Sequence, residues 1–71
     1  MIELSRIIIE EYVRTHNSAK SRRLAKLVEM SYDLFCEPTD EDAVFMEVAI
    51  KKERDPELKE ALQDLDDFLF C

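Results

Sequence analysis

The chain contains no glycine among its 71 residues. Tight hairpin turns of types I′ and II′ depend on glycine, and so do the loops that cradle phosphates in nucleotide-binding proteins. The sequence therefore argues against a hairpin-rich β fold and against a phosphate-binding loop. Only two prolines, Pro38 and Pro56, interrupt a chain rich in the helix formers Leu, Glu, Lys and Ala. We predict an all-α fold.

Cysteine and histidine are also scarce. Two cysteines, Cys36 and Cys71, are too few for a disulfide framework, and we expect both thiols to be reduced. The single histidine, His16, cannot build a closed zinc site without carboxylates. A helical di-metal site needs a Glu three residues before its histidine, and Val13 stands there instead. The sequence predicts no metal, no cofactor and no enzymatic activity.

Long apolar runs are absent as well. No run approaches the roughly 18 apolar residues of a membrane span. The N-terminal segment carries Glu3, Arg6 and Glu10, so it lacks the uninterrupted apolar stretch of a secretion signal. We expect a cytoplasmic protein with no membrane partner.

The formal net charge of −7 is unevenly distributed along the chain. Residues 1–36 carry six basic and five acidic side chains, whereas residues 37–71 carry four basic and twelve acidic ones. An acidic total argues against general nucleic-acid binding, which needs a basic surface to contact phosphates. The acidic half either keeps the protein soluble or attracts a basic partner.

A chain of this length forms one domain at most, residues 1–71, and buries only about 60% of its unfolded surface. Leu, Ile, Val and Phe account for 21 residues, too many for a disordered chain. Small folds usually gain stability from disulfides, a metal or a second copy. Since the first two are not expected here, we predict self-association.

Helical periodicity divides the chain into segments at residues 2–15, 18–35, 40–54 and 56–70. Residues 16–18 are either a turn between two helices or part of one continuous helix, so the chain has four helices or three. The apolar residues before and after this joint would face different directions on one straight helix, which favours a turn. Thr39 with Asp42 has the pattern of a capping box, and Asp55 precedes Pro56 as a second cap. The acidic run of residues 40–42 is therefore predicted to have a structural role, with a metal or partner site as the alternative.

Expected apolar faces follow from the same periodicity. The first segment should bury Leu4, Ile8, Ile9, Tyr12 and Val13, and the last should bury Leu58, Ala61, Leu62, Leu65, Phe68 and Leu69.

Residues 43–50 are apolar on nearly every side of a helix, or alternatively residues 44–50 form a strand. A helix of this kind is usually buried, but a short chain cannot wrap it completely. Its outer face should then meet a second copy or another protein. The candidate self-association residues are Phe45, Met46, Val48 and Ile50.

Four of the ten basic residues lie in residues 20–26. They form the candidate partner-binding group, or else an ordinary solvated face. The helix macrodipole disfavours cations in a first turn, so changing Lys20, Arg22 and Arg23 together to Ser should leave stability unchanged or raise it slightly. The group consists of Lys20, Arg22, Arg23 and Lys26.

The predicted fold is a small three- or four-helix bundle that self-associates. The predicted function is a non-enzymatic protein-interaction module, acting as a regulator, adaptor or inhibitor of another protein. One alternative is a dimeric nucleic-acid-binding regulator that uses residues 20–26. Another is an acidic mimic of nucleic acid that inhibits a nucleic-acid-binding protein.

Overall fold

The computed structural model describes residues 2–33 and 37–70 and shows four helices there with no strand. The predicted all-α bundle is confirmed with four helices, and the strand interpretation of residues 44–50 is wrong. The helices are α1 (Ile2–Thr15), α2 (Ala19–Tyr32), α3 (Asp40–Lys52) and α4 (Pro56–Phe70).

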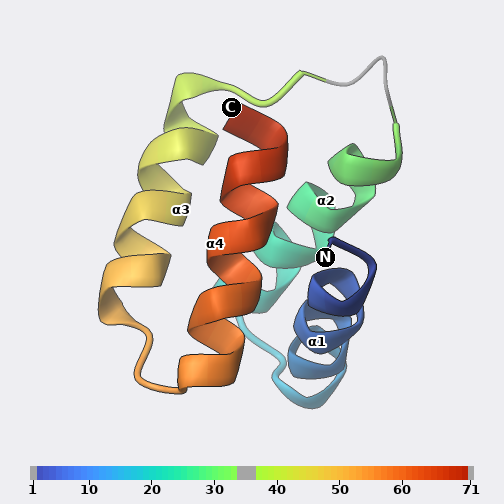
Figure 1. Cartoon of the computed structure of the whole chain (residues 1–71), viewed down its shortest axis with the longest axis vertical. Helices are drawn as coiled ribbons and strands as arrows, with labels where there is room; N and C mark the ends of the chain where they lie inside the picture. The colour runs from blue at the N-terminus through green and yellow to red at the C-terminus, as the bar shows by residue number, and fades with distance from the viewer. Residues whose placement is uncertain (1, 34–36, 71) are drawn as a thin grey trace.

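Helix α4 packs against each of the other three helices. Figure 1 shows α4 between α3 on one side and α1 on the other, with α2 behind them. The main packing partner of α3 is α4, so α3 lies at an edge of the bundle. Among the described residues, this position leaves one long side of α3 without a neighbouring helix.

The ambiguous joint at residues 16–18 is a turn, as the phase of the stripes indicated. Ser18 has an extended backbone, and its hydroxyl accepts a hydrogen bond from the Ser21 amide at 3.1 Å. This cap satisfies one of the free amides at the start of α2. The chain therefore begins a new helix rather than extending α1.

Both predicted caps in the second half of the chain are confirmed. The Thr39 hydroxyl accepts from the Asp42 amide at 3.2 Å, and the Asp42 carboxylate accepts from the Thr39 amide at 2.9 Å. At the start of α4, the Asp55 carboxylate accepts from the Glu57 amide at 3.0 Å. Side-chain hydrogen bonds thus satisfy free amides at the start of both helices.

Two helices end earlier than predicted. Helix α2 stops at Tyr32 rather than at Phe35: Asp33 is extended, and its amide bonds the Met30 carbonyl at 3.2 Å. Cys36 and Cys71 lie outside the described residues, so the prediction about their thiols stays untested. Helix α3 stops at Lys52 rather than near residue 54: Glu53 has an extended backbone, and its amide bonds the carbonyls of Ala49 and Ile50.

The core is built mainly from the apolar sides of α2 and α4, with one residue from α1 and two from α3. Met46 is completely buried, which places it in the core and not at the predicted self-association surface. The buried apolar residues are Ile9, Leu24, Leu27, Val28, Met46, Ala49, Leu58, Ala61, Leu62 and Leu65.

The predicted apolar faces need corrections at both ends of the chain. Leu4 is 61% exposed, and its neighbour Ser5 is buried instead because its hydroxyl donates to Asp64 at 2.7 Å. Phe68 is also exposed, and its ring lies beside the guanidinium of Arg6. Phe70, whose position the sequence left open, is half-buried and packs against the core.

We expect Met46→Ala to lower the free energy of unfolding by about 2–5 kcal/mol, the usual cost of emptying a buried site of this size. Val48→Ala on the same helix should change it by less than about 0.5 kcal/mol, because that side chain is largely outside the core. Urea unfolding in dilute solution, followed by circular dichroism, measures both values. Equal effects of the two substitutions would contradict the assignment of Met46 to the core.

Candidate protein-interaction surface

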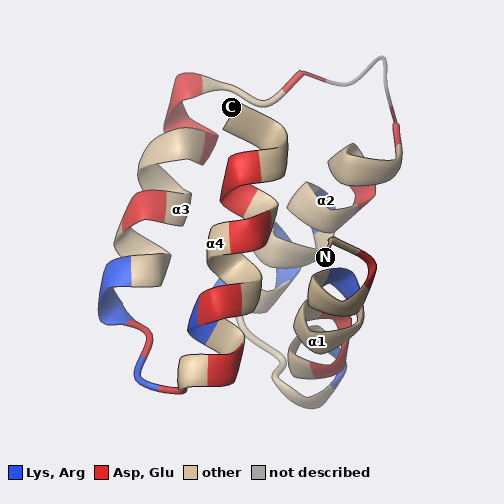
Figure 2. Ribbon diagram, viewed as in Figure 1, with Lys and Arg blue, Asp and Glu red and all other residues tan. Residues whose placement is uncertain are grey.

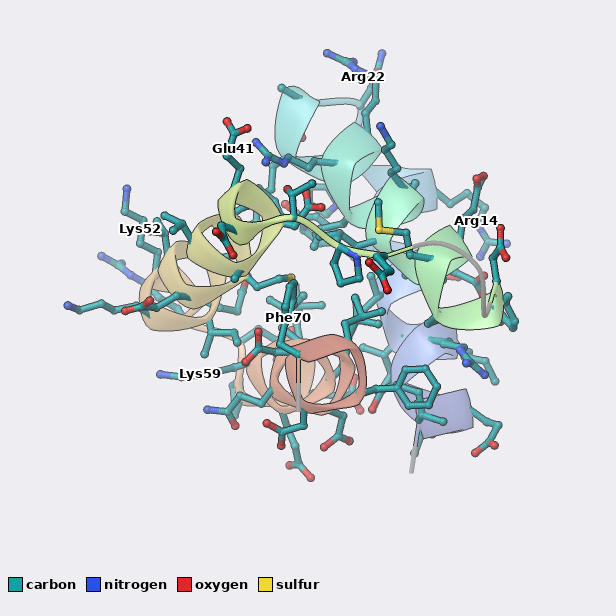
Figure 3. All side chains as sticks on the ribbon, turned by 90° about the horizontal axis from the view of Figure 1, so that it is seen from above. Arg14, Arg22, Glu41, Lys52, Lys59 and Phe70 are labelled. Atoms are coloured by element: carbon teal, nitrogen blue, oxygen red, sulfur yellow. The ribbon has the colours of Figure 1, made fainter. Side chains whose placement is uncertain are left out.

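The predicted basic group lies along α2, and half of it is engaged within the chain. Lys20 Nζ lies 3.4 Å from a carboxylate oxygen of Glu53, and Arg23 lies 3.5 Å from that of Asp42. Arg22 and Lys26 are exposed, and Figure 3 shows Arg22 pointing away from the bundle. The structure therefore divides the group into two tethering residues, Lys20 and Arg23, which pair with carboxylates of the same chain, and two exposed residues, Arg22 and Lys26.

Both tethering residues also contact aromatic rings. The Arg23 guanidinium lies 4.9 Å from the centroid of Phe45, and Lys20 Nζ lies 5.4 Å from that of Tyr12. Contacts of a cation over a ring within about 6 Å are attractive. Together with the ion pairs, they hold α2 against α3 and α1.

The ion pairs argue against the stability expectation drawn from the macrodipole, which stays a prediction. The carboxylate side chains of Glu53 and Asp42 are each only 13% exposed, so they are shielded partners for the two cations. The pKa of Asp42 is lowered, chiefly by the amide of Thr39 and further by Arg23. Removing Arg23 therefore takes a favourable partner from a largely buried carboxylate.

We expect Arg23→Ser to lower the free energy of unfolding by about 1 kcal/mol more than Arg22→Ser does, from one ion pair and one cation–ring contact. The two substitutions make the same chemical change one residue apart, so their helix-propensity costs cancel. Thermal unfolding at low and high salt measures the difference. Indistinguishable variants would show that the contacts of Arg23 add nothing to stability.

The outer side of α3 is an exposed apolar surface in the part of the chain that the structure describes, as is the pair Leu4 and Ile7 on α1, which is exposed to a similar extent. Val44 is 60% exposed and Val48 is 43% exposed. In a helix of 3.6 residues per turn, each lies about 160° around the axis from Met46, on the side opposite the core. We call the line of Glu41, Val44, Val48 and Lys51 the α3 face.

An open groove of about 500 Å³ borders the α3 face on the side of α2. Val44, Val48 and Phe45 provide its apolar lining, and Arg23 lines it from α2. Of the four predicted self-association residues, the structure thus brings Phe45 and Val48 to this surface. Met46 lies in the core, and Ile50 lines a different groove, toward α4.

Val44 belongs to the surface but was missing from the predicted set. Sequence reasoning treated residues 43–50 as apolar on all sides and so did not rank their directions. The spacing of Val44 and Val48, which is one helical turn and places both opposite Met46, was the signal that could have identified them.

The groove between α3 and α4 is acidic. Glu47, Asp66 and Asp67 border it, and the apolar side chains of Ile50 and Phe70 line it. The pKa of Asp66 is raised, first by burial and then by repulsion from the other two carboxylates. Among the described residues, no lysine or arginine lies within ion-pair distance of these three acids.

This shift gives a pH prediction. A carboxyl group whose folded pKa is raised opposes folding above that pKa, and its penalty disappears below the ordinary value of 3.8. We expect Asp66→Asn to raise the free energy of unfolding at neutral pH by about 0.2–0.5 kcal/mol, the scale of a like-charge pair on a helix surface. The advantage should vanish near pH 3.

Chemical denaturation at both pH values, with Glu60→Gln as an exposed control on α4, measures this difference. A stability gain that persists unchanged at low pH would show that the side-chain charge of Asp66 is not its cause.

The described residues show no metal-binding cluster and no membrane-spanning helix. His16 is exposed, stacks on Tyr12 with ring centroids 4.0 Å apart, and its Nδ1 lies 3.0 Å from the Tyr12 carbonyl oxygen. Within residues 2–33 and 37–70, no group of three or more His, Cys, Asp or Glu side chains is placed to hold a metal ion. The same residues include no helix with the length and apolar character to cross a membrane.

Comparison with known proteins gives no relative for this chain. No protein-family model matches it, and no significant match is found among curated proteins or solved structures.

Proposed function

We propose that the chain is a non-enzymatic protein-interaction module, a small regulator, adaptor or inhibitor that binds another polypeptide through the α3 face. The observation that carries the proposal is the exposure of Val44 and Val48, one helical turn apart and beside an open groove. A contiguous apolar strip bordered by charges is typical of a protein-binding surface.

The surroundings of the strip support helix docking. Phe45 and Arg23 form one wall of the adjoining groove, and their contact holds that wall in place. The helix itself is anchored by Met46 and Ala49 in the core and by the capping box at Thr39. A rigid helix with exposed residues one turn apart can insert into a groove, or pack along another helix.

The basic group on α2 is a weaker candidate for the main contact. Lys20 and Arg23 are already tethered to carboxylates of the same chain. Arg22 and Lys26 remain exposed and can add contacts at the edge of a complex, where charges influence the rate of association more than its strength.

A photo-crosslinking amino acid at position 48 tests the proposal in the native cells. We expect discrete protein adducts from position 48 and none from position 29, an exposed control on α2. Adding Val44→Asp to the same chain should abolish the adducts, because a charge at that position disrupts apolar packing. Mass spectrometry identifies the attached polypeptide.

Equal labelling from positions 48 and 29, or adducts that survive Val44→Asp, would contradict a binding site at the α3 face. Circular dichroism of each variant separates loss of binding from loss of fold.

A further inference from the structure

Charge changes sign along the α3 face. The first turn of α3 is acidic, with Asp40 and Glu41, and its last turn is basic, with Lys51 and Lys52. Figure 2 shows acidic residues at one end of α3 and basic residues at the other. In Figure 3, the labelled Glu41 and Lys52 both project away from the bundle. The exposed valines lie between the two charged ends.

The four residues of the α3 face are also symmetric about Met46. Val44 and Val48 lie two residues before and after it, and Glu41 and Lys51 lie five before and after it. Their successive spacings of three, four and three residues are those of the contact positions in a coiled coil. All four residues are exposed.

From this pattern we infer that the α3 face binds a second copy of the chain. Two α3 helices would pack antiparallel about a two-fold axis that crosses the interface at the level of residue 46 along the helix. Val44 of each copy then meets Val48 of the other, and Glu41 of each copy meets Lys51 of the other. The inference rests on the proposed function, because it names the partner of the same surface.

Charge complementarity selects the antiparallel direction. A parallel pair would bring Glu41 against Glu41 and Lys51 against Lys51, and like charges across an interface are strongly unfavourable. The antiparallel pair replaces both repulsions with two ion pairs and opposes the two helix dipoles. A two-fold contact needs a surface complementary to itself, and this order of charges provides one.

Two features make the association weak. One helix from each copy buries less than the roughly 1,200 Å² of a standard stable interface. Under two-fold symmetry, the two Glu47 side chains lie on the same flank of the helix pair, next to the acidic grooves, and repel each other. We therefore expect a reversible dimer at high chain concentration, and tighter association when Glu47 is changed to Gln.

Sedimentation equilibrium over a wide concentration range tests the inference with charge-exchanged variants. Glu41→Lys and Lys51→Glu should each weaken self-association by roughly tenfold or more, because each places like charges opposite one another. The double variant should associate again, since it restores both ion pairs in reverse. An equimolar mixture of the two single variants should form a mixed dimer for the same reason.

Glu29→Lys on α2 makes the same charge change as Glu41→Lys but away from the α3 face, so it should leave association near the wild-type level. Circular dichroism confirms that each monomeric variant is folded. Failure of the double variant to recover association, or a dimer insensitive to both single changes, would overturn the antiparallel pairing.

Two results separate this inference from the proposed function. A wild-type chain that stays monomeric at the highest concentration, yet forms adducts with a different protein from position 48, defeats the inference and leaves the function standing. A monomeric chain without any such adduct defeats both.

Discussion

The arrangement of the bundle depends on the packing of the other three helices against the apolar side of α4. Leu58, Ala61, Leu62 and Leu65 are buried, and α1, α2 and α3 all pack against this one helix. Helix α1 and helix α2 also pack on each other, which places them on one side of α4 and leaves α3 on the other. The exposure of the α3 face follows from this division, because no remaining segment among the described residues covers it.

Much of the fold could be predicted because its determinants are local. The spacing of apolar residues identifies four segments, and the polar residues Ser18, Thr39 and Asp55 mark where three of the helices begin. A cap bonds an amide only two or three residues away, so it can be read from the sequence without knowing the rest of the structure. The end of α2 was less predictable, because no comparable signal stands at Tyr32.

The errors concern which apolar residues are buried. Periodicity treats Leu4 and Phe68 as core residues, whereas contacts between distant segments decide otherwise. Ser5 turns inward because Asp64, 59 residues away, accepts its hydrogen bond. Arg6 donates a hydrogen bond to Ser31, and its guanidinium lies against the rings of Tyr32 and Phe68. These two rings therefore contact a surface arginine instead of the core. The pairing of Arg23 with Asp42, which changes the reading of the basic group, is equally nonlocal.

The glycine-free turns have a further consequence, for the unfolded chain rather than the folded one. No described residue has a positive φ, so no turn in residues 2–33 or 37–70 requires the freedom that glycine supplies. Glycine has more backbone conformations to lose on folding than any other residue, and replacing it at compatible positions stabilises a protein by about 0.4–1 kcal/mol. A chain whose turns are built entirely from residues with a Cβ atom begins from a narrower unfolded ensemble. Folding therefore costs this chain less backbone entropy per residue than it would cost a glycine-rich chain. A core of the same size then leaves a larger net stability.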